Sequence, residues 1–288
     1  MTRRQFLGAA AVALATPALA RFQTADHFEG KDVLARILSQ AQREGWKKLP
    51  MGEVVGKVGM SLAGTPYVGF TFEISDDVEY CVINLKGLDC ATFYEAALAM
   101  ARTIKSSRPN ETEFRRQIQL IRYRGGRMNG YTSRLHYAID YFFDNERKGI
   151  VKMLSQDLPG AQIYPRKVFF MSKNPDKYRQ LKAHPEWVPA IEKMETSIND
   201  RRNFYIPKDR IADDETLLKT GDIIGLTTTA AGLDVSHTGM CYRDDQGVLR
   251  FLHASSLKNE VVLDVRLSDF LAKARTNDGI IVCRPLEL

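Results

Sequence analysis

The sequence has few of the residues that most often carry out chemistry: five histidines, four cysteines and two tryptophans among 288 residues. No tract interleaves basic and aromatic side chains as nucleic-acid-binding modules do, so the net charge of +6 does not indicate a nucleic-acid partner. No repeat or low-complexity linker divides the chain. We therefore expect a single domain after the N-terminal segment.

The first 20 residues have the three parts of an export signal. Arg3 and Arg4 precede an apolar stretch that ends in Ala18-Leu19-Ala20. The twin arginine indicates the Tat route, and cleavage after Ala20 lowers the net charge from +6 to +4. The apolar stretch is too short to span a bilayer, and no cysteine follows to take a lipid, so we expect a periplasmic protein without a stable membrane anchor. An uncleaved, membrane-anchoring N-terminus is the alternative.

Cys90 lies where a β-rich stretch stops and a helical pattern begins. Asp89 is well placed to cap the helix, and Phe93, Ala97 and Met100 recur at helical spacing. Free N–H groups at a helix start stabilise a thiolate, so we expect the pKa of Cys90 to fall below its ordinary value of about 8.5. Cys90 is thus the candidate nucleophile, and a small buried apolar residue is the alternative interpretation.

Two of the histidines lie in strand-like segments near the C-terminus. His237 opens one apolar run, and His253 closes the next, after a turn signal at 244–247. Adjacent strands would bring both imidazoles together. A cysteine at a helix start, a histidine base and a third polar group that holds its tautomer form an arrangement for acyl transfer.

The other cysteines, Cys81, Cys241 and Cys283, each lie in an apolar strand-like run. Disulfides are allowed outside the cytoplasm, but these three cannot all pair if Cys90 stays free. We expect buried free thiols, with a Cys241–Cys283 bridge as the alternative.

The patterns predict an α+β domain in which the Cys90 helix packs on an antiparallel sheet. A helical lead-in spans about 21–64, and the tract from about 111 to 202 reads as helical, which gives a helical insertion at about 107–203. The other expected segments are helices at 28–48, 51–63 and 267–274 and strands at 68–72, 80–85, 222–228, 236–243, 248–254, 259–264 and 279–284.

The helical insertion contains an amphipathic pattern that borders the proposed cleft. Its apolar stripe comprises Leu135, Ala138, Ile139, Phe142 and Phe143, and its polar face comprises Arg134, His136, Asp140 and Asp144.

Several short motifs follow one another in a familiar order. They are Thr65-Pro66-Tyr67, Gly87-Leu88-Asp89-Cys90, Ser133-Arg134-Leu135-His136-Tyr137, Tyr205-Ile206-Pro207, Gly221-Asp222-Ile223-Ile224, Gly232-Leu233-Asp234-Val235-Ser236-His237-Thr238-Gly239 and Leu252-His253-Ala254-Ser255. From about residue 50 to the C-terminus the series resembles the NlpC-type, papain-like peptidoglycan hydrolases. More narrowly, it resembles their N-acetylmuramoyl-L-alanine amidase-like subgroup.

This resemblance implies a Cys90 nucleophile, a His237 base and a His253 orienting group. It also implies that the Tyr67 hydroxyl stabilises the oxyanion together with the Cys90 N–H, where the alternative is an ordinary cleft aromatic. Asp89, Arg134 and His136 would border the site and bind substrate. Their alternatives are a helix cap for Asp89 and a solvated helix face for the other two.

The implied activity is a cysteine amidase that needs no metal or cofactor. It would cut the bond between N-acetylmuramic acid and L-Ala of peptidoglycan fragments through a thioester, with anhydro-muramic acid as the expected sugar. Ala91-Thr92 stands where many endopeptidases of this type have Ser-Gly, and the 147 residues from Cys90 to His237 leave room for an insertion that narrows the cleft to small substrates.

Three rival hypotheses remain open from the sequence. The first is an endopeptidase that cuts between D-Glu and the diamino acid. The second is a zinc site formed by Cys90, His237 and His253, for which no fourth ligand is evident. The third is a non-catalytic muropeptide-binding module. The sequence makes no prediction of the oligomeric state.

Overall fold

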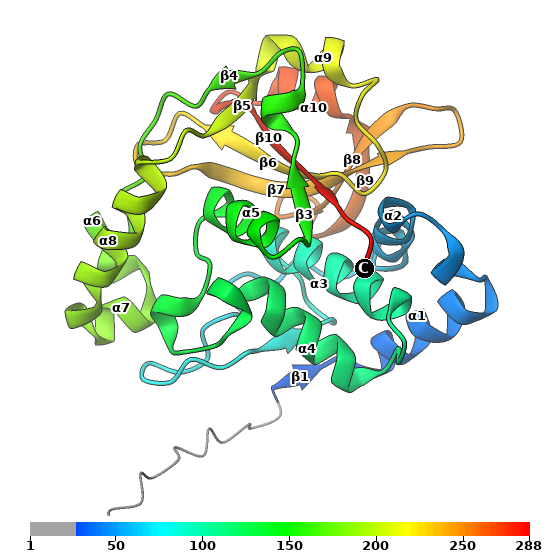
Figure 1. Ribbon diagram of the computed structural model, residues 1–288, viewed down its shortest axis with the longest axis horizontal. Helices are drawn as coiled ribbons and strands as arrows, with labels where there is room; N and C mark the ends of the chain where they lie inside the picture. Colours follow the sequence, from blue (N-terminus) through cyan, green and yellow to red (C-terminus); the bar gives the residue numbers. More distant parts are fainter. Residues whose placement is uncertain (1–26) are drawn as a thin grey trace, which may run out of the picture.

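Residues 27–288 of the chain, as described by a computed structural model, fold around one antiparallel sheet. The sheet has eight strands in the order β4-β5-β10-β6-β7-β8-β9, and β3 pairs with β10 outside this path. Helices α1 to α5 lie below the sheet and α9 and α10 lie above it in Figure 1. The predicted export signal, residues 1–20, lies outside the described residues.

The strands of the C-terminal part are those that the sequence predicts, each within two residues of its expected ends. Helix α10, Leu267–Lys273, also agrees with the prediction. The strands of the main sheet are β3 Val151–Met153, β4 Gln162–Ile163, β5 Phe204–Pro207, β6 Ile223–Thr228, β7 Val235–Arg243, β8 Leu249–Ser255, β9 Glu260–Arg266 and β10 Asn277–Pro285.

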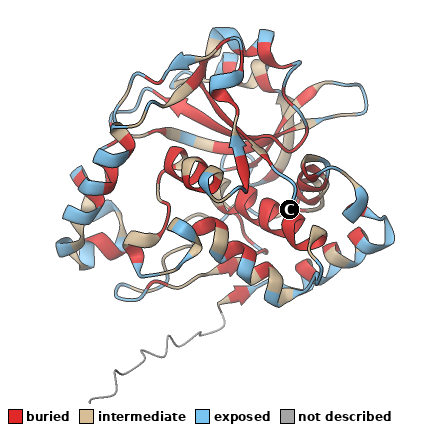
Figure 2. Cartoon of the chain, in the orientation of Figure 1, coloured by how far each residue is buried: buried red, intermediate tan, exposed pale blue. Residues whose placement is uncertain are grey.

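Helix α3, Cys90–Lys105, packs on β7 and β8 and carries the candidate nucleophile at its first residue. The Asp89 side chain accepts hydrogen bonds from the N–H groups of Ala91 at 3.0 Å and Thr92 at 2.8 Å, and the Thr92 hydroxyl accepts one from the Asp89 N–H. This reciprocal cap fixes the first turn. From Thr92 to Ile104 every residue is buried, as Figure 2 shows for this central helix, so both the cap and the core set the position of Cys90.

The remaining elements surround α3 and the sheet. Helices α6 to α8 gather beside the sheet at one end of the molecule (Figure 1). Their bounds, with those of the other elements, are β1 Phe28–Glu29, α1 Lys31–Arg43, α2 Met51–Ser61, β2 Ile83–Asn84, α4 Glu111–Arg122, α5 Ala138–Arg147, α6 Phe170–Lys173, α7 Arg179–Ala183, α8 Val188–Asn199 and α9 Ile211–Asp214. Among residues 27–288, no helix is both long and apolar enough to cross a membrane.

The N-terminal predictions hold in part. Helix α2 confirms the expected helix at 51–63, but the helix expected at 28–48 begins only at Lys31, because Phe28 and Glu29 pair with Ile83 and Asn84. The prediction of a strand at 68–72 is wrong. Phe70 has a φ of 62°, which is a left-handed conformation that extended strands exclude, and this segment is a loop.

The prediction of one continuous helical tract between 111 and 202 is also wrong. Glycines with positive φ at Gly125, Gly126, Gly130 and Gly149 interrupt it, and only Gly adopts this conformation at little cost. Strand β3 then pairs with β10, and β4 pairs with β5. The segment therefore belongs partly to the main sheet and is not a purely helical insertion.

The polar face expected for this segment is buried rather than solvated. Asp140 is fully buried and forms ion pairs with Arg124 at 2.5 Å and Arg201 at 2.7 Å. Asp144 is buried as well, and its Oδ2 pairs with Lys148 at 2.8 Å. The two Asp140 pairs join α5 to the 3-10 turn after α4 and to the residues that follow α8. They come from chain segments that helical periodicity does not relate to one another, whereas Asp144 and Lys148 are four residues apart.

All four cysteines are free thiols, and the alternative Cys241–Cys283 bridge is wrong. Met240 and Cys283 both pair with Ile223 of β6, from its two sides, so Cys241 points to the opposite face of the sheet from Cys283. Cys283 accordingly belongs to the core beneath the sheet and Cys241 to the core above it. A disulfide cannot cross the sheet between them.

A buried ion pair joins α3 to α4. The Nη2 atom of Arg122 lies 2.5 Å from Oε2 of Glu95, and each side chain is 4% exposed. The Arg122 guanidinium also donates a hydrogen bond to the carbonyl of Val82, so it links the chain before the Cys90 helix to both helices.

We expect Arg122→Met to lower the free energy of unfolding by about 3–5 kcal/mol, because it leaves the Glu95 carboxylate buried and unpaired. Urea unfolding followed by circular dichroism measures the difference. The matched control is Arg116→Met on the same helix, which breaks a pair with Glu113 from an exposed guanidinium and should cost less than about 1 kcal/mol. Equal losses in the two variants would contradict this prediction.

Candidate active site

The start of α3 is fastened to its neighbours on two sides. The Thr238 hydroxyl of β7 donates a hydrogen bond of 2.8 Å to the Cys90 carbonyl. On the other side Tyr67 forms a β-bridge with Leu88, and its N–H donates to the carbonyl of Asn259 at 2.8 Å. Tyr67, Cys90 and β7 are thus held together by backbone contacts as well as by the core.

The two C-terminal histidines meet as predicted. Nε2 of His237 lies 2.7 Å from Nδ1 of His253, with the rings nearly perpendicular. His237 follows a β-bulge at Ser236, because the pairing of β6 with β7 shifts by one residue at that point. The prediction that neighbouring strands bring the two imidazoles together is confirmed.

His253 is enclosed behind His237. Its ring stacks on Phe251 at 4.6 Å and meets the edge of Phe270 at 5.3 Å. Its Nε2 lies 3.4 Å from Oδ2 of Asp264 on β9. Sequence reasoning did not find Asp264, because it lies 11 residues from His253 in a strand that carries no recognisable motif. The only available signal was its position, one strand along from His253.

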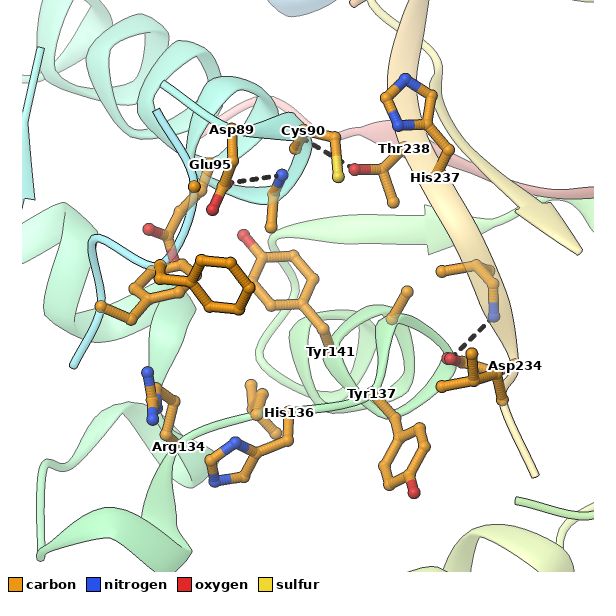
Figure 3. A pocket seen from close by; sticks show the side chains of 18 of the residues that line it. Asp89, Cys90, Glu95, Arg134, His136, Tyr137, Tyr141, Asp234, His237 and Thr238 are labelled. Atoms are coloured by element: carbon orange, nitrogen blue, oxygen red, sulfur yellow. Dashed lines mark hydrogen bonds between the residues drawn. The ribbon is translucent and has the colours of Figure 1, made fainter. Parts of the chain in front are cut away.

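A cavity of about 760 Å³ opens in front of these residues. Tyr67, Cys90, His237 and Thr238 line one part of it. In Figure 3 the sulfur of Cys90 and a ring nitrogen of His237 lie on facing sides, with Thr238 between the two residues. Because Nε2 of His237 is engaged by His253, the nitrogen available to Cys90 is Nδ1.

Burial raises the pKa of the Cys90 thiol to about 11, and the adjacent Asp89 carboxylate acts in the same direction. Hydrogen bonds from Thr238 and from the Ala91 N–H oppose this shift without outweighing it. The expected lowering of this pKa is therefore wrong, because burial dominates the helix terminus. Burial, aided by His253, lowers the pKa of His237 to about 3. At neutral pH the pair is a thiol and a neutral imidazole.

These shifts predict a broad pH profile. The base form of His237 persists far below its ordinary pKa of about 6.5, and the Cys90 thiol stays protonated far above its ordinary value. We expect kcat/KM for a muropeptide to change by less than about threefold between pH 5 and pH 9, measured from initial rates. An acid limb with an apparent pKa of 6 to 7 would show instead that His237 titrates as a free imidazole.

Tyr67 is suited to donate a hydrogen bond. Burial, with the nearby Cys90 and Asp89, raises the pKa of its phenol to about 12, so the hydroxyl keeps its proton. The Cys90 N–H, at the first residue of the helix, has no acceptor within the helix. Together they provide two donors at the edge of the cavity.

We expect Tyr67→Phe to lower kcat by about 10²-fold with KM changed little, because one oxyanion donor is removed. Steady-state kinetics on a muropeptide checks this. The control is Tyr242→Phe, which removes a half-buried hydroxyl of β7 that does not line the cavity. An unchanged kcat in Tyr67→Phe would mean that Tyr67 is an ordinary aromatic residue of the cleft and does not stabilise the oxyanion.

Asp89, Arg134 and His136 all line the cavity. Asp89 serves as the helix cap, the alternative that the sequence left open. Arg134 and His136 precede α5 and lie across the cavity from Cys90 in Figure 3, so the alternative of a solvated helix face is wrong. A direct role of the three in substrate binding stays a prediction.

Arg134 and His136 each have internal partners. Nη2 of Arg134 pairs with Glu73 at 2.6 Å, and its Nε lies 3.3 Å from Glu79. Nε2 of His136 lies 3.0 Å from the carbonyl of Tyr131, and burial holds the pKa of His136 well below its ordinary value. His136 is therefore neutral and presents Nδ1 as an acceptor.

The loop before Cys90 contributes an exposed aromatic residue to the rim of the cavity. Phe70 is 93% exposed and has a positive φ, a combination that costs stability and is typical of functional positions. Phe72, two residues later, is fixed between the guanidinium groups of Arg122 and Arg134. The failed strand prediction at 68–72 therefore marks the part of the chain that borders the site.

A shared metal does not fit the two histidines as they lie. Within residues 27–288 no three His, Cys, Asp or Glu side chains are grouped as metal ligands. The facing nitrogens of His237 and His253 bond to each other, so they cannot both point at one ion.

The chain and its fold are similar to known proteins. A family model described as N-acetylmuramoyl-L-alanine amidase-like (AmiA-like) covers residues 57–280. The chain belongs to this N-acetylmuramoyl-L-alanine amidase-like family, and the predicted assignment to the amidases is confirmed. None of the curated proteins matches it significantly.

Solved structures agree with the family. An N-acetylmuramoyl-L-alanine amidase from Bacteroides uniformis is 35% identical, with a TM-score of 0.76 over 82% of this chain and 99% of that one. A Bacteroides fragilis protein described as a candidate xylanase is 39% identical, with a TM-score of 0.73 over 78% and 98%. A Legionella pneumophila protein at 19% identity and a TM-score of 0.67, over 89% and 95%, shares the fold.

The cavity does not have the carboxylate pair of a glycosidase. Such enzymes need two carboxyl groups that flank the scissile bond and are available to it. Here each lining carboxylate is engaged by the protein: Asp89 caps α3, Glu95 pairs with Arg122, Glu73 pairs with Arg134, and Asp234 accepts the N–H groups of Ile139 and Val235.

Proposed function

We propose that the protein is a papain-like cysteine amidase that hydrolyses the bond between N-acetylmuramic acid and L-Ala of peptidoglycan fragments. The observation that carries the proposal is the placement of Cys90, at a capped helix start, and His237 in one cavity, with His253 behind His237 at 2.7 Å. This combination provides a nucleophile, a neutral base and a group that orients the base.

The reaction follows from the protonation states. The Cys90 thiol gives its proton to Nδ1 of His237 as the sulfur attacks the lactyl carbonyl, and Tyr67 and the Cys90 N–H stabilise the oxyanion. His237 then donates this proton to the L-Ala nitrogen as the C–N bond breaks, which leaves a thioester. Water attacks the thioester, gives a proton to His237 and releases the muramic carboxylic acid, and the thiolate recovers its proton.

A soluble fragment that carries anhydro-muramic acid is the substrate we favour. Support for a small substrate comes from the cavity walls, since the chain segments 73–79 and 177–184 are joined beside it. Asp76 pairs with Arg179 at 2.5 Å, and Asp77 lies 3.1 Å from Nε2 of His184. We further propose export to the periplasm by the Tat route, which fractionation of cells that carry Arg3→Lys and Arg4→Lys would test.

The decisive experiment is mass analysis of the products from defined muropeptides. An anhydro-disaccharide with an intact lactyl acid, together with a stem peptide that starts with a free L-Ala amine, is the expected result. Cleavage between D-Glu and the diamino acid would establish the endopeptidase instead. Binding without any product would leave a muropeptide-binding module.

A further inference from the structure

Asp264 ends the hydrogen-bonded series behind the cavity. Its Oδ2 lies 3.4 Å from Nε2 of His253 and 2.9 Å from Nζ of Lys258, and its Oδ1 accepts the N–H of Val265 at 2.8 Å. The carboxylate is 12% exposed and does not line the cavity. It therefore contacts His253 rather than a substrate.

The sheet departs from regular pairing at this residue. Arg250 pairs with Arg266, but Leu252 pairs with Leu263, so β9 holds one more residue than β8 across this step. At this step Asp264 and Val265 of β9 lie opposite the single residue Phe251 of β8. Bulges of this kind re-aim a side chain and occur beside active sites.

The carboxylate determines where the hydrogens of the two rings lie. Although burial acts against it, hydrogen bonds from Lys258, the Val265 N–H and His253 keep the pKa of Asp264 below its ordinary value, so the group is ionised. An ionised carboxylate can only accept, which requires the hydrogen of neutral His253 to be on Nε2. Nδ1 of His253 is then bare.

The same constraint passes on to His237. A bare Nδ1 on His253 requires the hydrogen of His237 to be on Nε2, since the two atoms are 2.7 Å apart. The remaining nitrogen of His237, Nδ1, is then free of hydrogen on the side of Cys90. The opposite pair of tautomers would place a hydrogen where the thiol proton has to go.

We propose that Asp264 is a positioning residue that fixes the tautomers of both histidines and so leaves His237 able to take the Cys90 proton. The inference rests on the proposed function, in which Cys90 is the nucleophile and His237 the base. Lys258 serves as the counter-ion that keeps the carboxylate in place.

The test combines histidine ring ¹⁵N NMR with kinetics. In the substrate-free protein at pH 7 we expect Nε2 of both rings to carry hydrogen and both Nδ1 atoms to be bare. Asp264→Asn should reverse these tautomers, because the Val265 N–H retains the amide oxygen and the NH2 group then faces His253. It should also lower kcat roughly 10²-fold or more with KM within threefold. Asp264→Glu keeps an acceptor and should retain the original tautomers and more activity than the Asn variant.

The matched control is Glu260→Gln, which removes the same charge from an exposed position of the same strand and should change neither readout. Thermal melting of each variant verifies that it is folded. Asp264→Asn with unchanged tautomers, or with kcat within threefold of the original protein, overturns the inference. Absence of turnover in the unsubstituted protein would refute the proposed function instead. The NMR spectra are recorded without substrate, so they test the role of Asp264 independently of activity.

Discussion

Cys90→Ala is expected to lower kcat for muropeptide cleavage by roughly 10⁴-fold or more, because no atom remains that can form the thioester. The variant should fold normally, since Asp89 and Thr92 make the helix cap without the sulfur. Product formation followed by mass spectrometry measures the loss. Muropeptide binding should persist, because the rest of the cavity is unchanged.

The control for this variant is Cys81→Ala, at a thiol that contacts Arg122 and does not line the cavity. Its activity should stay within about threefold of that of the original protein. Iodoacetamide should inactivate the unsubstituted protein and the Cys81→Ala variant equally, because both retain Cys90. Retention of a substantial part of the activity in Cys90→Ala would contradict covalent catalysis by this residue.

His237→Ala is expected to lower kcat/KM at pH 7 by roughly 10³-fold or more, because nothing then removes the thiol proton. Burial holds the Cys90 pKa at about 11, so the residual activity should depend on the thiolate fraction and rise about tenfold per pH unit up to pH 10. The original protein should show no such slope between pH 5 and pH 9.

His27→Gln is the matched control for this variant. The ring of His27 contacts that of Tyr80 at 4.5 Å, and His27 does not line the cavity. Its rate and pH profile should match those of the original protein. A pH-independent residual rate in His237→Ala would mean that the thiol is deprotonated by another group.

The sequence predicted the elements that local rules determine. Short apolar runs separated by turn signals indicate β6 to β10, and the Asp89 cap with the apolar repeat from Phe93 defines the start of α3. The order of the motifs along the chain also relates Cys90, His237 and His253 to one another. These features depend on neighbours within a few residues in the chain.

The features that the sequence did not predict depend on contacts between distant segments. The pKa of Cys90 depends on how deeply the α3 start is covered, which no local pattern reports. Asp140 is buried because Arg124 and Arg201 reach it from other elements. Asp264 meets His253 through a register shift between two strands, and such shifts leave no signature in a single sequence.

The pairing of β3 with β10 limits how this enzyme can be re-engineered. Deletion of residues 107–203 to widen the cavity would remove the partners of β10 and β5 and leave open strand edges that invite aggregation. Residues 170–199 supply Met171 and Tyr178 to the cavity wall but no strand to the sheet. Loop shortening or grafting confined to that stretch is the route to altered substrate choice with the scaffold intact.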